Sequence, residues 1–232
     1  MKLAIMQPYF LPYVGYFQLM NAVDVFVIYD HIKYTKKGWI NRNRFLLNGT
    51  DSMFSLPLKK GSDGLDVVLR ELAAEFDRTK LLSQFIGAYR RAPYFAQTFP
   101  LLERIVHHED GNLFWFIHHS LAEVCAHLQI NTEIRASSSL PVDKELRSQD
   151  KVLAICGALG AKRYINPIGG TELYVREDFA ARGIELQFLK PRTFEYAQFG
   201  NEFVPWLSII DVLMFNPIEV VRERLDHHFD LV

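Results

Sequence analysis

Cysteine is scarce in this sequence, because Cys125 and Cys156 are the only two thiols among 232 residues. Both lie inside apolar stretches with helical spacing, which predicts buried, free thiols in a reducing compartment. Two cysteines in such settings argue against a disulfide framework and against a thiolate metal site. We therefore expect a cytoplasmic protein.

A marked excess of charge is also missing, since 26 basic and 27 acidic residues leave a formal net charge of −1. We therefore expect no nucleic-acid partner. Residues 1–29 are strongly apolar, but Pro8 and Pro12 interrupt any continuous helix there. Asn21 and Asp24 break the apolar run as well. No uninterrupted apolar stretch reaches the roughly 18 residues that spanning a bilayer requires, so we expect no integral membrane segment.

What the chain does contain is enough apolar sequence for a substantial core, at 49% of its residues. Lys2–Met6 and Asp24–Tyr29 are short apolar runs typical of buried strands. Between them, Gly15–Ala22 has the pattern of a short helix. This order predicts a βαβ unit, and hence a parallel sheet with a right-handed crossover.

The next stretch predicts a hairpin followed by helices. Asn48-Gly49-Thr50-Asp51 lies between the apolar segments Phe45–Leu47 and Met53–Leu58, a pattern typical of a β-hairpin. From about residue 69 to residue 128, apolar residues recur at helical spacing. We expect breaks in this helical region at Pro93, Pro100 and Gly111.

Strands and helices alternate again after residue 130. We expect strands at Thr132–Ala136, Arg163–Ile165 and Ile184–Leu189, and helices at Gln149–Leu159, Thr171–Arg182, Phe203–Phe215 and Ile218–Leu225. Gly183 is expected to end the helix before it. The predicted fold is α/β, with a parallel Rossmann-like sheet. We expect one domain over residues 1–232, with a helical insertion at about 69–130 and a β-hairpin.

The first candidate site is the turn between the first strand and its helix. Ligands of open α/β sheets bind at the carboxyl ends of strands, where helix N-termini offer free N–H groups to anions. We expect Gln7, Gly15 and Tyr16 to hold a cofactor here, with Gly15 allowing close approach of a phosphate. The layout resembles the first turn of nucleotidylyltransferases and pantothenate synthetases, with Tyr13 and Tyr16 in place of their two histidines. The alternative is an ordinary turn packed with aromatic side chains.

The second candidate site is the segment Lys36–Arg44, which is rich in amides and cations. Asn side chains read hydroxyls and amides, Arg clamps phosphate or carboxylate, and Trp stacks on a sugar or base. The residues of this segment that we expect to bind substrate are Lys37, Trp39, Asn41, Arg42 and Asn43. The alternative is a solvated basic turn before the hairpin.

The third candidate site is the strand end and glycine loop within Tyr164–Tyr174. Asn166 ends the strand and is expected to contact substrate. Gly169, Gly170 and Thr171 could hold an anion at the start of the next helix, which Thr171 could also cap. Glu172 could be a base or a metal ligand, although acidic residues in a first helical turn usually compensate the helix dipole.

Asp30 and His31 follow the second strand, where either could accept a proton. Ser138 lies in a polar loop after another strand and is expected to touch ligand. Most other histidines occur as adjacent pairs, and neighbours on a helix point about 100° apart. No spacing typical of a metal site is present, so we expect none.

Five motifs, in order along the chain, resemble the WbqC-like family. They are Gln7–Gln18, Gly38–Asn43, Ser137–Leu140, Tyr164–Gly170 and Leu207–Asn216. The family is associated with bacterial surface-polysaccharide (O-antigen) gene clusters. The resemblance implies processing of an amino sugar, by attachment of glycine or another acyl group to its nitrogen. His31 stands where the family pattern leads us to expect a second acidic residue.

The residues and the resemblance together suggest an acyl or aminoacyl transferase, or an ATP-dependent ligase, that acts on a nucleotide-linked amino sugar. Asp30 or His31 would deprotonate the attacking amine, and Glu172 is the third candidate catalytic residue. ATP with Mg²⁺, or acyl-coenzyme A, could supply the activation. The alternative is a module that binds a nucleotide sugar or a polysaccharide intermediate without changing it.

Overall fold

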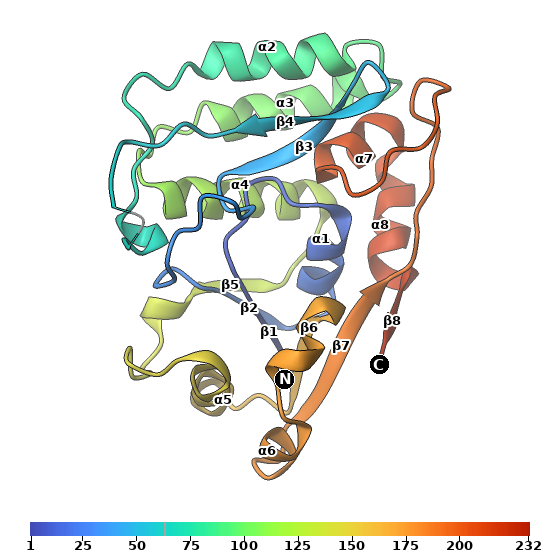
Figure 1. The fold of residues 1–232 in the computed structure, drawn as a ribbon. Helices are drawn as coiled ribbons and strands as arrows, with labels where there is room; N and C mark the ends of the chain where they lie inside the picture. Colours follow the sequence, from blue (N-terminus) through green and yellow to red (C-terminus); the bar gives the residue numbers. More distant parts are fainter. Residues whose placement is uncertain (63) are drawn as a thin grey trace.

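A central sheet of six strands organises the molecule (Figure 1). The computed structural model describes residues 1–62 and 64–232. The six strands, in sheet order, are β5 (Glu133–Ala136), β2 (Val25–Ile28), β1 (Lys2–Met6), β6 (Arg163–Pro167), β7 (Glu185–Pro191) and β8 (Phe229–Leu231). Pairing is parallel from β5 to β7, while β8 joins the edge antiparallel to β7. The expected α/β fold with a parallel Rossmann-like sheet is confirmed.

The two faces of the sheet are covered by different helices. The helices are α1 (Val14–Asn21), α2 (Arg78–Tyr89), α3 (Phe95–Val106), α4 (Leu113–Leu128), α5 (Ser148–Leu159), α6 (Arg176–Ala180), α7 (Ile209–Phe215) and α8 (Ile218–His227). Side chains alternate between the faces along a strand. Ala4 of β1 joins the core under α1–α4, α7 and α8, whereas Leu3 and Ile5 join the core under α5 and α6. The sequence periodicity of β1 therefore reflects two apolar layers.

The predicted helical region contains three helices, α2, α3 and α4, which pack into the same apolar core as one sheet face. The breaks expected at Pro93 and Gly111 fall between these helices. The break expected at Pro100 is wrong, because this residue lies inside α3. A proline there removes only one backbone donor, and burial of Leu101, Leu102 and Ile105 stabilises the helix around it. The assignment of residues 1–232 to one domain remains a prediction.

The hairpin is shifted from its expected limits. Strands β3 (Arg42–Leu47) and β4 (Thr50–Ser55) pair antiparallel across a two-residue turn. Asn48 and Gly49 have φ values of 52° and 80°, the conformation that favours Asn-Gly in tight hairpins. The segment Lys36–Arg44, the second candidate site, therefore runs into strand β3.

Two helices were expected to be longer than they are. Ile168–Leu173 forms a 3-10 helix (η3), and α6 begins only at Arg176. Tyr174 and Val175 are extended between the two, and the Val175 N–H donates to the side-chain oxygen of Gln149 at 2.6 Å instead of to a helical carbonyl. Thr171 consequently does not cap an α-helix. Gly183 lies beyond the end of α6, with φ of 68°.

The helix expected from Phe203 begins only at Ile209, because Ser208 is its N-cap and accepts the Ile210 N–H. Trp206, two residues earlier, has φ of 60° and interrupts any helix. Across the residues that the structure describes, no helix has the length and apolar character needed to cross a membrane. Strand β8 was not expected, since it has only three residues and a single residue, His228, separates it from α8.

Candidate functional site

The carboxyl ends of four neighbouring strands form one edge of the sheet. The register places Ile28 of β2 opposite Met6 of β1 and Ala136 of β5, so the residues that follow these strands lie side by side. The chain passes from β1 to β2 on one side, while β6 lies on the other side of β1. Such a reversal of strand order is where open α/β sheets bind ligands.

Asp30 is the most constrained polar residue at this edge. It is only 1% exposed, and its Oδ1 atom accepts three hydrogen bonds. The donors are the Ser137 hydroxyl at 2.6 Å, the Ser138 N–H at 3.0 Å and the His31 N–H at 3.0 Å. Its Oδ2 atom is buried and has no partner within the described part of the chain. A buried carboxylate oxygen without a donor is costly, which makes Oδ2 a candidate ligand contact.

The hydrogen bonds around Asp30 decide its charge. Burial alone raises the pKa of this carboxyl group, but the hydrogen bonds from Ser137 and Ser138 and the nearby His31 act in the opposite direction. The balance places the pKa of Asp30 below its ordinary value. Asp30 is therefore an anion at neutral pH, suited to hold a cationic or hydrogen-bond-donating group.

His31 is half-buried and lies beside a second carboxylate. Its Nδ1 atom is 3.4 Å from Oδ2 of Asp66, and the Lys33 ammonium is 2.9 Å from the other oxygen of Asp66. Burial raises the pKa of Asp66, but Lys33 and His31 lower it below its ordinary value. When Nδ1 carries the proton and donates to Asp66, Nε2 is left as an acceptor. In enzymes that use a histidine as general base, a carboxylate commonly orients the imidazole ring in this way.

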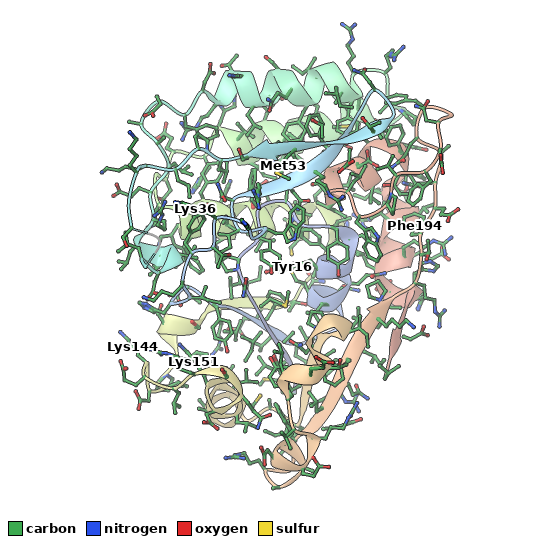
Figure 2. The ribbon with its side chains drawn as sticks, in the orientation of Figure 1. Tyr16, Lys36, Met53, Lys144, Lys151 and Phe194 are labelled. Carbon is green, nitrogen blue, oxygen red and sulfur yellow. The ribbon has the colours of Figure 1, made fainter. Side chains whose placement is uncertain are left out.

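A small pocket opens next to this group. His31, Ser137 and Ser138 line it on one side, and Lys144 and Lys151 bring positive charge to the other. The Lys151 ammonium also lies 5.6 Å from the centre of the Tyr29 ring. Figure 2 labels both lysines beside α5.

The turn after β1 is filled by aromatic side chains. Tyr16 is buried, and its hydroxyl donates to the Gln7 carbonyl at 2.9 Å. A Cβ atom built on Gly15 would lie 2.4 Å from the Tyr13 ring, so that ring occupies the space above this glycine. A phosphate could approach the Gly15 backbone only after the Tyr13 side chain moved.

In the segment Lys36–Arg44, the side-chain amides of Asn41 and Asn43 form hydrogen bonds with the backbone of the protein. Asn43 donates to the Leu11 carbonyl at 2.9 Å and accepts the Arg44 N–H at 2.8 Å. Asn41 donates to the Leu56 carbonyl at 2.8 Å. Arg42 donates to Gly38, while Lys37 and Trp39 are exposed. Substrate binding by these residues remains a prediction, which the Asn43 bonds do not favour.

The expected site residues of the glycine loop after β6 are partly buried and partly exposed. Asn166 is buried, and its Nδ2 atom lies only 2.0 Å from where a Cβ of Gly170 would stand. Gly170 is therefore required for Asn166 to pack as it does. Gly169, Thr171 and Glu172 are exposed, and Glu172 has no hydrogen bond or ion pair to another described residue. Their binding roles stay predictions.

Of the expected site residues, Asp30, His31 and Ser138 are thus in direct contact, Gln7 contacts Tyr16, and Asn166 packs on Gly170. Sequence reasoning missed Asp66, which lies in a stretch without strand or helix periodicity. It placed Ser137 with Ser138 in a polar loop that touches ligand, and did not foresee that Ser137, directly after β5, donates to Asp30. Within residues 1–62 and 64–232, no cluster of three or more metal-ligating side chains is present.

Comparisons with known proteins agree along almost the whole chain. The WbqC-like protein family matches residues 7–223. The uncharacterized protein Rv1507c of Mycobacterium tuberculosis (strain ATCC 25618 / H37Rv) is 26% identical over 218 residues, which cover 93% of each chain. No solved structure matches the chain. With a match over this length, the chain belongs to the WbqC-like protein family.

Proposed function

We propose that this protein transfers an acyl group, with glycine as the first amino-acid candidate, to the amine of a nucleotide-linked amino sugar. Family membership directs the proposal towards bacterial surface-polysaccharide synthesis. The observation that carries it is the ionised, buried Asp30, with Oδ1 fully engaged and Oδ2 without a partner in the described chain. An amine or ammonium group is the chemical match for that oxygen.

Asp30 acts in this proposal as the anchor of the amine. Its lowered pKa makes it a weak base but a good acceptor for an N–H group. Positive charge develops on the nitrogen as it attacks, and a neighbouring carboxylate stabilises that charge. Because Oδ2 is shielded from water, the substrate must displace a covering side chain to reach it.

His31 is the proton acceptor. Its ring is oriented by Asp66, which leaves Nε2 available. The amine nitrogen attacks the carbonyl carbon of an acyl thioester, and a C–N bond forms while the C–S bond breaks. His31 takes the proton from nitrogen and returns it to the departing thiolate, so that atoms and charge balance.

A donor that is already activated fits the first turn better than ATP does. Tyr13 and Tyr16 stand where related folds place histidines, and the Tyr16 hydroxyl is engaged by Gln7. No imidazole is therefore available at this turn to act on a nucleotide phosphate. The proposal places the reaction in the cytoplasm, a reducing compartment that suits two free cysteines. Burial raises the pKa of Cys125 and of Cys156 to about 12, so both thiols stay protonated.

The second candidate function is a binding module without turnover. It is favoured by the loss of the two histidines at the first turn and by the structural hydrogen bonds of Asn43. One experiment separates the two functions. The protein is incubated with a panel of nucleotide-linked amino sugars and either glycine with ATP and Mg²⁺ or acyl-coenzyme A, and the products are analysed by mass spectrometry.

A new acyl mass on the sugar, absent with His31→Gln, would support the enzyme. His31→Gln should lower the rate by about 10²- to 10⁴-fold, the usual contribution of a general base. Binding of a nucleotide sugar without any new mass across the panel would contradict the enzyme and support the module.

A further inference from the structure

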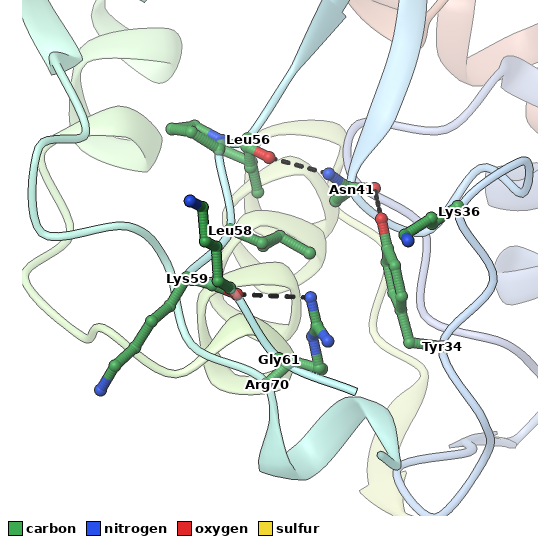
Figure 3. Close-up of a pocket in the computed structure, with 10 residues that line it drawn as sticks. Tyr34, Lys36, Asn41, Leu56, Leu58, Lys59, Gly61 and Arg70 are labelled. Carbon is green, nitrogen blue, oxygen red and sulfur yellow. Dashed lines mark hydrogen bonds between the residues drawn. The ribbon is translucent and has the colours of Figure 1, made fainter. Parts of the chain in front are cut away.

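A cationic cleft lies between the β2–β3 connection and the chain that leaves β4. It has a volume of about 420 Å³. Tyr34 and Asn41 lie on one side of it and Lys59 on the other, with Arg70 between them (Figure 3). Lys60 also lines the cleft. None of the expected site residues except Asn41 belongs to it.

The charged side chains that line the cleft in the described part of the chain are all basic. Lys36, Lys59, Lys60 and Arg70 line it, and no acidic residue is among the described lining residues. Lys59 pairs with Glu71 at 2.8 Å at the exposed rim. A concave surface of this kind concentrates positive potential and attracts anions.

Arg70 is a buried arginine held in a fixed position inside the cleft. It is 6% exposed, and its guanidinium lies 4.7 Å from the centre of the Tyr34 ring. Its two terminal nitrogens donate to the carbonyls of Ser62 and Lys59, which leaves a further N–H on each. Its Nε atom is buried without a partner among the described residues. A guanidinium held flat with donors to spare is the usual reader of phosphate oxygens.

Tyr34 and Asn41, which line the cleft beside Arg70, are also held by hydrogen bonds. The Tyr34 hydroxyl donates to Asn41, which in turn donates to the Leu56 carbonyl, so this chain of hydrogen bonds anchors the hydroxyl end of the Tyr34 ring that lies against Arg70. Figure 3 shows both bonds, from Tyr34 to Asn41 and from Asn41 to Leu56.

The cleft is connected to Asp30 through paired backbone. Val68 donates its N–H to the Asp30 carbonyl, and Tyr34 donates to the Leu65 carbonyl, so residues 30–34 and 65–68 run together. Asp30 and Tyr34 are four positions apart, so even a fully extended backbone between them would span no more than about 13 Å. A sugar linked to a diphosphate can bridge a gap of this order.

We propose that this cleft binds the diphosphate group of a nucleotide, and that Arg70, Lys59 and Lys60 are its main contacts. The inference rests on the proposed function in one respect, because the nucleotide is assigned to the amino-sugar substrate whose amine meets Asp30. Diphosphate from ATP has the same chemistry and is distinguished by the test below.

The test is calorimetric titration with inorganic pyrophosphate, UDP and ADP. Arg70→Lys keeps the charge but loses the planar fork, and should weaken pyrophosphate binding about 10- to 150-fold. Lys60→Glu reverses an exposed charge, and should weaken it at least about fivefold at low salt. Lys162→Glu, an exposed lysine just before β6 at the opposite end of the sheet, is the matched control and should change nothing.

Thermal unfolding of each variant shows whether the fold is kept, and Lys60→Glu remains decisive if Arg70→Lys does not fold. Competition of pyrophosphate with a UDP-linked amino sugar, but not with a non-hydrolysable ATP analogue, would assign the cleft to the sugar nucleotide. The reverse would assign the cleft to ATP and overturn the assignment to the sugar nucleotide.

Absence of pyrophosphate binding, or equal affinity in wild type, Lys60→Glu and Lys162→Glu, would overturn the inference. Asp30→Asn should leave pyrophosphate affinity unchanged. If Lys60→Glu loses pyrophosphate binding but no acyl transfer is found, the cleft stands and the proposed function fails. If Asp30→Asn loses transfer while pyrophosphate never binds, the proposed function stands and the cleft fails.

Discussion

The Ser137 hydroxyl donates a 2.6 Å hydrogen bond to Oδ1 of Asp30, although 107 positions separate the two residues in the sequence. The parallel pairing of β2 with β5 brings them together at the ends of adjacent strands. This bond is one reason why a carboxyl group that is 1% exposed remains ionised. Ser137 is therefore a positioning residue for Asp30.

Ser137→Ala should destabilise the protein by about 1.5–3 kcal/mol at pH 7, because it removes a hydrogen bond to a charged group. The pKa of Asp30 is lowered in the folded state, so its stabilising contribution is present above the ordinary value of 3.8 and is lost as the pH falls through the folded pKa. The difference between Ser137→Ala and wild type should accordingly shrink below about pH 4. Urea unfolding at pH 7 and pH 3 measures this.

Ser139→Ala is the control for Ser137→Ala, since this exposed serine of the same turn donates only to the Ala136 carbonyl. It should give a smaller loss with no dependence on pH. A difference between Ser137→Ala and wild type that is equal at both pH values would contradict the role of Ser137 in keeping Asp30 charged.

Asn43 and Asn41 should respond differently to truncation. Asn43→Ala removes the bonds to Leu11 and Arg44, and should cost about 1–3 kcal/mol of stability with little effect on substrate affinity. Asn41→Ala removes the support of Tyr34 and should weaken diphosphate binding as well. Thermal unfolding and calorimetry on both variants test this. A large loss of affinity with unchanged stability for Asn43→Ala would instead make Asn43 a substrate contact.

Asp211 is the centre of a buried hydrogen-bond network distant from the sheet edge. It accepts from the Tyr89 hydroxyl at 2.8 Å, the Tyr196 hydroxyl at 2.6 Å and the Gln198 amide at 2.7 Å. Burial raises the pKa of Asp211, and these hydrogen bonds only partly offset it. The network joins α2 and α7 to the loop that precedes α7.

Asp211→Asn should destabilise the protein by about 1–3 kcal/mol, because one of the three donors would then face an amide N–H. Tyr196→Phe removes a single donor and should cost less. Urea unfolding of both variants measures which substitution costs more free energy of unfolding. An Asp211→Asn protein as stable as wild type would show that the network is not a fold determinant.

The hairpin turn gives a further prediction. Gly49 has φ of 80°, so Gly49→Ala should lose about 1–2 kcal/mol of stability from left-handed backbone strain. Gly169 is not in that conformation and has no atom within 4 Å of an added Cβ, so Gly169→Ala is its control and should be nearly neutral. Thermal unfolding compares the two. Equal losses would contradict the turn geometry.

Sequence patterns predicted the elements whose signal is local. The apolar runs of β1 and β2 and the Asn48-Gly49 turn could be read directly, because burial on both faces and a left-handed turn each demand particular residue types. The shortened α6 could not be read, since the bond from Val175 to Gln149 spans 26 positions.

In the candidate site too, residues with a local sequence signal were predicted, and residues brought in by contacts distant in the sequence were not. Asp30 and His31 were identifiable because they follow a recognisable strand. Their partners Ser137 and Asp66 became evident only from the pairing of segments 107 and 35 positions away. The Asn41 and Asn43 amides looked like substrate readers, but an amide that satisfies buried backbone has the same sequence signature.

The central claim is that the Asp30 carboxylate holds the amine that is acylated. The most direct test is the kcat/KM of Asp30→Asn for the amino-sugar nucleotide, with folding checked by thermal unfolding and nucleotide affinity by calorimetry. We predict that kcat/KM falls about 10- to 150-fold, the loss expected for one charged hydrogen bond, while affinity for the nucleotide portion is unchanged. A folded Asp30→Asn protein that retains wild-type kcat/KM would contradict the account.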